Sequence, residues 1–242
     1  MRVLLLLLAL ALTGCASPIY RAGDTVVTRV STTDHPRPSV ILIHGCGGTQ
    51  PHEHWMGILD QQGFNTVLID YISYRGFTTI CDKNAPISIT AVASDVDQII
   101  AWVRTQKWHK GRVSAMGFSF GGSITNTFTD PKNLEAKGII AGNIRRLDRI
   151  VSVYPQCGIG ALAEQTLTPT QVHFGLSDYW THHSYCMVDR LDKSNYDLIY
   201  YPNAYHGFDM PGVSLLVNGH HRVEFNQQAF DLMKVRLVEF LR

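Results

Sequence analysis

The sequence predicts an α/β protein with a mostly parallel central sheet and helices on both faces. Short β-branched runs alternate with longer segments of helical period, as expected for strands joined by helices. Two of the short runs, Val40–Ile43 and Thr66–Ile69, are apolar along their whole length, which is typical of strands covered on both faces. We therefore expect these two strands at the centre of the sheet.

The same patterns place the other elements in chain order. Seven strands are expected, namely Thr25–Val30, Val40–Ile43, Thr66–Ile69, Arg112–Met116, Ile150–Tyr154, Thr170–Phe174 and Leu198–Tyr201. The clearest helix spans 89–103, where an apolar residue recurs every three or four positions. A second helix is expected from about Arg222 to Leu241. Ligands of such sheets bind outside the carboxyl ends of the strands, so the residues that follow each strand are the candidates for chemistry.

The first residues predict an export signal. Arg2 is followed by an apolar run, 3–12, that is too short for a permanent membrane span. Small residues and Cys15 come next, and Leu12-Thr13-Gly14-Cys15 resembles the lipobox of bacterial lipoproteins. We expect residues 1–14 to be a signal peptide, 15–24 a tether and 25–242 one folded domain.

Cys15 would then carry the lipid and attach the protein to a bacterial membrane. The alternative is an ordinary secretory signal with an incidental cysteine. Because Ala16 and not Asp follows the cysteine, the periplasmic face of the outer membrane is favoured over the inner membrane.

The charge of the chain argues against a nucleic-acid partner. Lys and Arg number 21 against 20 Asp and Glu, and the net charge is +1 with His neutral. There is no basic run, which phosphate binding would require. The sequence predicts no cofactor, and it leaves the oligomeric state open.

A nucleophile motif directly follows the expected strand Arg112–Met116. Residues 117–122 read GFSFGG, and a helical pattern comes next, so a G-x-S-x-G motif stands in its required setting between strand and helix. The glycines are needed because side chains two residues either side of Ser119 would collide in so sharp a turn. Ser119 is therefore the candidate nucleophile.

A serine hydroxyl needs an imidazole to take its proton and a carboxylate to hold that imidazole in the right tautomer. Asp178 follows the strand Thr170–Phe174, and His206 follows the strand Leu198–Tyr201. The order Ser, Asp, His is that of the α/β-hydrolases. We predict a catalytic triad of Ser119, Asp178 and His206; a helix cap and a loop histidine are the alternatives for the last two.

The developing alkoxide needs two backbone N–H groups, which together form an oxyanion hole. One is expected from Phe120, directly after the nucleophile. The other is expected from Cys46, in the glycine-rich HGCGG turn at 44–48. A flexible connection between strand and helix is the alternative interpretation of that turn.

Taken together, these motifs resemble the dienelactone hydrolase family of α/β-hydrolases, and its exported members in particular. The resemblance covers nearly the whole mature chain. It is carried by HGCGG at 44–48, DYISYRG at 70–76, GFSFGG at 117–122, YPQC at 154–157, SDYW at 177–180 and YHGFD at 205–209.

The chain departs from the enzyme that gives the family its name. That enzyme has a cysteine nucleophile and a glutamate in the oxyanion loop, where this chain has Ser119 and Gly45. The departure favours an ordinary carboxylesterase that hydrolyses small esters or lactones through an acyl-enzyme. Two alternatives stay open: a peptidase or thioesterase on the same triad, and an envelope lipoprotein that only binds its ligand.

Three residues near the expected site are candidate substrate contacts. Arg75 follows the strand Thr66–Ile69 and could bind a substrate carboxylate, although a surface ion pair is as good an interpretation. Tyr74 and Trp180 are expected at the same pocket. The paired histidines at 52 and 54, 182 and 183, and 220 and 221 have no third ligand arranged with them at strand ends, so no metal site is expected.

Four cysteines remain after Cys15, and an even number in an exported protein suggests disulfides. Sequence alone allows three connectivities, and buried free thiols are the alternative. We propose the pairs Cys46 with Cys81 and Cys157 with Cys186, because each pair belongs to connections that should adjoin at the active-site end. Exported proteins of the resembled family carry cysteines at similar places.

Overall fold

The computed structural model describes residues 20–22, 25–33, 35–81, 87–136, 138 and 147–242. The predicted signal peptide and the lipidation site Cys15 lie outside the described residues. Within this part of the chain, no helix is long and apolar enough to cross a membrane.

An eight-stranded sheet runs through the molecule in the order β1-β2-β4-β3-β5-β6-β7-β8. Its strands are β1 (Tyr20–Ala22), β2 (Thr25–Ser31), β3 (Arg37–Ile43), β4 (Asn65–Ile69), β5 (His109–Phe118), β6 (Arg149–Val153), β7 (Thr170–Gly175) and β8 (Tyr196–Tyr201). The pairs from β4 to β8 are parallel, and β1 and β2 are added antiparallel at one edge. All seven predicted strands are present. The sheet also extends, through β1, into the segment that the sequence analysis predicted as a tether.

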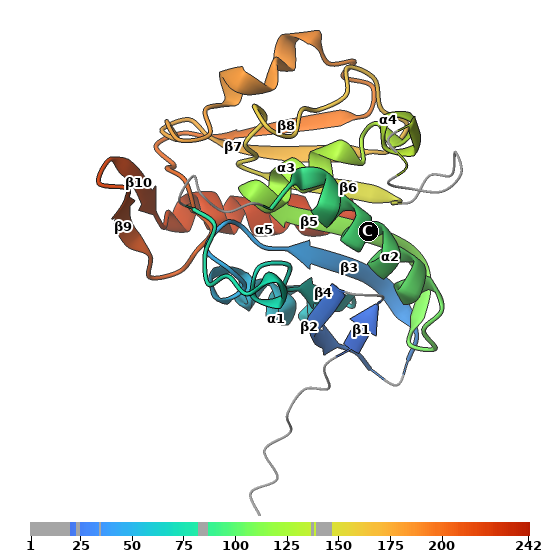
Figure 1. The fold of residues 1–242 in the computed structure, drawn as a ribbon. Coiled ribbons are helices and arrows are strands. Elements are labelled where there is room, and N and C mark those ends of the chain that lie inside the picture. Colours follow the sequence, from blue (N-terminus) through green and yellow to red (C-terminus); the bar gives the residue numbers. More distant parts are fainter. Residues whose placement is uncertain (1–19, 23–24, 34, 82–86, 137, 139–146) are drawn as a thin grey trace, which may run out of the picture.

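Helices cover both faces of the sheet, as predicted (Figure 1). They are α1 (His54–Gln61), α2 (Ile89–Arg104), α3 (Phe120–Thr127), α4 (Pro131–Ala136) and α5 (Gln227–Leu241), with short 3-10 turns at Gln50–His52, Ser73–Arg75, His183–Cys186 and Val188–Arg190. Alternate residues of β3 point to opposite sides. Ile41 and Ile43 pack with α2, α3 and α4, whereas Val40 and Leu42 pack with α1 and α5. β3 and β4 lie inside the sheet, buried on both faces as expected.

The C-terminal helix begins later than the sequence analysis predicted. It starts at Gln227, where the side chain of Asn226 accepts a hydrogen bond from the N–H of Ala229 and caps the helix. The residues before it form a separate hairpin of β9 (Ser214–Val217) and β10 (His221–Glu224). The prediction of a helix from Arg222 is therefore wrong at its first turn.

Both predicted disulfides are present. Cys46 is bonded to Cys81 and Cys157 to Cys186, each pair with its Cα atoms 4.9 Å apart. The first bridge joins the loop after β3 to the segment after β4, and the second joins the loop after β6 to the loop after β7. Each disulfide therefore ties together two connections at the carboxyl edge of the sheet.

A buried histidine in β7 makes the stability of the fold depend on pH. His173 is hydrogen-bonded to the Tyr201 hydroxyl and to Gln171, and burial lowers its pKa from 6.5 to about 3. The folded chain keeps this imidazole neutral while the unfolded chain protonates it below pH 6.5, so stability falls as the pH drops. We expect this residue to cost about 2 kcal/mol of the free energy of unfolding between pH 7 and pH 5.

Urea unfolding at the two pH values checks this expectation. The loss between pH 7 and pH 5 should be smaller in His173→Gln than in the wild type. An equal loss in both proteins would show that His173 does not cause it.

Candidate active site

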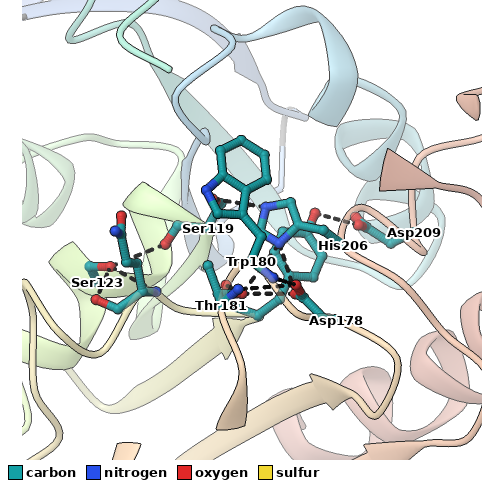
Figure 2. A network of polar contacts seen from close by, with 9 residues as sticks. Ser119, Ser123, Asp178, Trp180, Thr181, His206 and Asp209 are labelled. Atoms are coloured by element: carbon teal, nitrogen blue, oxygen red, sulfur yellow. Dashed lines mark hydrogen bonds and ion pairs between the residues drawn. The ribbon is translucent and has the colours of Figure 1, made fainter. Parts of the chain in front are cut away.

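Three polar side chains from three loops meet at the carboxyl edge of the sheet. Ser119 follows β5, Asp178 lies after β7, and His206 lies after β8. The Oγ of Ser119 is 3.0 Å from His206 Nε2, and His206 Nδ1 is 2.8 Å from Asp178 Oδ2. Figure 2 shows the three residues in series. The fold thus brings together residues that the sequence separates by up to 87 positions.

The turn that presents Ser119 is strained and tightly packed. Ser119 has φ 52° and ψ −114°, a left-handed conformation that non-glycine residues rarely adopt. A Cβ at Gly117 would lie 2.1 Å from the carbonyl oxygen of Gly121. A Cβ at Gly121 would lie 2.1 Å from the carbonyl oxygen of Ile43. Both glycines are therefore required, as the motif predicts, for the turn to fit against β3.

Asp178 is held in its ionised form by several donors. Its Oδ1 accepts hydrogen bonds from the backbone N–H groups of Trp180 and Thr181, and its Oδ2 accepts one from the Thr181 hydroxyl at 2.8 Å. Burial by itself would raise the pKa of this carboxyl, but His206 and the Thr181 donors outweigh it, so the pKa lies below its ordinary value. The site therefore holds a buried, ionised Asp178 carboxylate beside the His206 imidazole.

His206 is fixed by its neighbours on several sides. Its backbone carbonyl accepts a hydrogen bond of 2.9 Å from the N–H of Glu224, and it forms an isolated bridge with Val223 in β10. The Tyr154 and Trp180 rings lie 4.4 and 4.7 Å from the imidazole, between ring centroids. The β9–β10 hairpin therefore supports the position of His206.

The glycine-rich loop after β3 lies directly beside the nucleophile. A Cβ at Gly45 would stand 3.3 Å from the Cβ of Ser119. The carbonyl of the next residue, Cys46, accepts hydrogen bonds from the N–H of Ile80 and the hydroxyl of Thr79. Together with the disulfide to Cys81, these bonds hold the loop against the segment that follows β4.

Two hollows open beside Ser119. The first is a cavity of about 170 Å³. Its apolar wall is built by the β9–β10 hairpin and the segment before it, with Met210, Val213, Leu215, Val217 and Val223. The second hollow lies along Phe120 and Gln156, with Thr181, Asn218 and His221 among its polar lining residues. Both hollows border the Cys46–Cys81 disulfide and Trp180.

The structure brings only one of the three predicted substrate contacts to these hollows. Trp180 lines both, and its ring stacks on His221 at 4.8 Å between centroids. Arg75 instead forms an ion pair of 2.5 Å with Asp95 in α2 and donates to the Tyr71 carbonyl. Tyr74 is 40% exposed and lies beside Arg75. Neither residue is among those that line the two hollows, and the ion pair with Asp95 agrees with the alternative interpretation of Arg75.

Three contributors to the site were not predicted from the sequence. The Thr181 hydroxyl lies between Asp178 and the Tyr154 carbonyl, at 3.0 Å from the latter. His52 lines the apolar cavity. The buried Asp209 accepts hydrogen bonds from the Tyr154 hydroxyl at 2.5 Å and from the Trp55 indole at 2.7 Å.

Across the described part of the chain, no group of three or more His, Cys, Asp or Glu side chains is placed to hold a metal ion.

Residues 50–155 match the family model of the X-Pro dipeptidyl-peptidase (S15 family). The matched region includes the nucleophile turn and β6, but it ends before Asp178 and His206. It spans less than half of the chain. No curated protein matches the sequence at a significant level.

Comparison of the structure shows the α/β-hydrolase fold. A dienelactone hydrolase from Anabaena variabilis superposes with a TM-score of 0.66 at 16% identity, covering 93% of this chain and 95% of that one. A dienelactone hydrolase-like promiscuous phosphotriesterase from metagenomic libraries gives 0.63 at 20% identity, with 92% and 95% covered. A carboxylesterase from Lactobacillus plantarum gives 0.64 at 16%, with 88% and 90% covered.

Proposed function

We propose that this protein is a serine hydrolase, and specifically a carboxylesterase that cleaves small esters or lactones through an acyl-enzyme. The observation that carries the proposal is the hydrogen-bonded series Ser119, His206 and Asp178 on a strained turn at the carboxyl edge of the sheet. An α/β-hydrolase fold that is shared with esterases and dienelactone hydrolases supports it.

Each member of the series has a defined part in this reaction. Ser119 Oγ attacks the ester carbonyl carbon while His206 Nε2 takes its proton, and His206 then gives that proton to the leaving alcohol oxygen as the C–O bond breaks. Water, deprotonated by the same nitrogen, attacks the acyl carbon; the bond from that carbon to Ser119 Oγ breaks, His206 returns the proton to Oγ, and the acid is released. Asp178 stabilises the imidazolium in both halves and keeps Nδ1 protonated.

The negative charge on the carbonyl oxygen would be stabilised by the backbone N–H groups of Phe120 and Cys46. The N–H of Phe120 is at the first position of α3, where a helix leaves its amides without intrahelical partners. Cys46 belongs to the loop that packs against Ser119, and the disulfide holds that loop in place before substrate binds. Donors fixed in advance are the ones that lower the barrier most.

The cavity favours a small ester. Its volume of about 170 Å³ is below the range of roughly 300–1,000 Å³ that is usual for drug-sized ligands, and the second hollow, of about 330 Å³, is at the lower end of that range. A short acyl or alcohol group would fill it against the valines and Leu215 of the hairpin.

A substrate panel separates this proposal from the peptidase and thioesterase alternatives. Purified protein should hydrolyse p-nitrophenyl acetate and propionate with the highest kcat/KM, whereas Xaa-Pro p-nitroanilides and acyl thioesters should be poorer substrates. The S15 match is the observation that favours a peptidase. Efficient release of p-nitroaniline from a prolyl substrate would therefore favour that alternative, and binding without turnover of any substrate would favour a ligand-binding protein.

We further propose that Cys15 carries the lipid that attaches the protein to the cell envelope, at the periplasmic face of the outer membrane. The lipobox-like Leu12-Thr13-Gly14-Cys15 supports this location. Cys15→Ala should move the protein from the membrane fraction to the soluble periplasmic fraction, as followed by blotting after cell fractionation. A Cys81→Ala variant, which keeps the lipobox, is the matched control. Unchanged membrane association of Cys15→Ala would refute the lipid anchor.

A further inference from the structure

One buried side chain in the apolar cavity has no part in the mechanism above. His52 ends the turn Gln50–His52 and is only 3% exposed, yet it lines the cavity next to Ser119. Its ring stacks on Phe118, with the centroids 4.0 Å apart and the planes 10° apart. The two nitrogens of this ring face different surroundings.

One nitrogen faces the protein interior. Nδ1 is shut off from solvent and has no hydrogen-bond partner among the described residues, and its nearest acidic atom is Asp209 Oδ2 at 4.0 Å. Both oxygens of Asp209 already accept hydrogen bonds, one from Tyr154 and one from Trp55. Asp209 Oδ2 is the acceptor atom on that side of the ring, so we assign the proton of the neutral imidazole to Nδ1.

The other nitrogen faces the reacting groups. Nε2 lies 3.5 Å from the position that a Cβ on Gly45 would take, and that same position is 3.3 Å from the Ser119 Cβ. The missing side chain of Gly45 therefore leaves room between the nucleophile and His52. In the assigned tautomer, Nε2 presents a lone pair to this room.

His52 stays uncharged in this setting. Burial lowers its pKa well below the ordinary value, and the nearby His44, His54 and His206 lower it further. A neutral imidazole with Nδ1 protonated is a hydrogen-bond acceptor at Nε2. A carboxylate would not be attracted to it, whereas a hydroxyl would.

We propose that His52 is a substrate-binding residue whose Nε2 accepts a hydrogen bond from a hydroxyl group of the ester, close to the scissile carbonyl. This inference rests on the proposed function and names its substrate class: small hydroxyl-bearing esters. The otherwise apolar hairpin wall would contact the hydrocarbon part, while His52 would select the hydroxyl. Because Nε2 lies so near Ser119, the hydroxyl is only a few bonds from the ester carbonyl, on either the acyl or the alcohol side.

Matched esters test this proposal and distinguish the two sides. The kcat/KM of the wild type is measured for ethyl lactate, which has the hydroxyl on the acyl group, for hydroxyethyl propanoate, which has it on the alcohol, and for ethyl propanoate, which lacks it. We expect the kcat/KM for one hydroxyl-bearing ester to exceed that for ethyl propanoate by roughly tenfold or more. This ratio corresponds to about one buried hydrogen bond. The ester that is preferred identifies the side.

Variants then assign that preference to His52. His52→Phe keeps a flat ring on Phe118 and removes both nitrogens, so the preference should fall to about one. His52→Gln retains an acceptor oxygen and should keep part of the preference. His54→Phe is the matched control, since His54 is two residues away and is not among the residues that line either hollow beside Ser119; it should leave the preference unchanged.

Two results would overturn the proposal. The first is a wild type that hydrolyses all three esters equally well, which needs no variant and leaves the esterase function intact. The second is a His52→Phe variant that keeps the full preference. A wild type that hydrolyses no ester at all, and whose Ser119 fails to react with a fluorophosphonate, would overturn both this inference and the proposed function.

Discussion

Ser119→Ala should abolish ester hydrolysis, with a loss in kcat on the order of a millionfold. The variant lacks the oxygen that forms the acyl-enzyme, and among the described residues no other hydroxyl is hydrogen-bonded to His206 Nε2. Background hydrolysis of p-nitrophenyl acetate by the variant, measured against buffer, checks the expectation.

The fold should survive this substitution. Ser119 makes no side-chain cap to α3, so its hydroxyl contributes little to the helix, and alanine meets the same backbone strain as serine. The free energy of unfolding in urea should change by less than about 1 kcal/mol. A folded variant that retained a tenth of the wild-type activity would contradict the assignment of the nucleophile.

Asp178→Asn should lower kcat by roughly a thousandfold or more. The asparagine can turn its amide N–H toward His206 Nδ1, which stabilises the tautomer with the proton on Nε2. That nitrogen can then no longer accept the proton of Ser119. The loss of the carboxylate also removes the charge that would stabilise the imidazolium.

The matched control for this variant is Asp189→Asn. Asp189 is an exposed acidic residue in the short turn Val188–Arg190, in the same long loop after β7. Its substitution should leave kcat within about twofold. If Asp178→Asn lost only severalfold, or if Asp189→Asn lost more than Asp178→Asn, another carboxylate would be the partner of His206.

Much of this fold could be predicted because short runs of consecutive residues are enough to identify its strands. Runs such as Val40–Ile43 are uniformly apolar since both faces of β3 are buried. The hairpin β9–β10 also has a local signal, the Asn218-Gly219 dipeptide, and both residues have the positive φ of a tight hairpin turn. In the sequence analysis no strand is predicted at Ser214–Val217 and the last helix begins at about Arg222, inside β10, so the wall of the cavity is missed.

The proximity of Ser119, Asp178 and His206 could be predicted because each of them follows a strand, and parallel strands bring such residues to one edge of the sheet. Contacts that depend on packing between distant segments could not. The sequence places Arg75 near the site, but it cannot show that the Arg75 guanidinium forms an ion pair with Asp95 in α2. Nor does it show that Asp209, 157 positions after His52, lies beneath that imidazole.

Labelling with a fluorophosphonate tests the central claim most directly, because only a serine activated by its neighbours reacts. Folded wild-type protein should form one covalent adduct, and peptide mapping by mass spectrometry should place it on Ser119. The adduct should be absent from Ser119→Ala and from protein unfolded in urea. A folded wild type that fails to react, or an adduct on a different residue, would contradict the account.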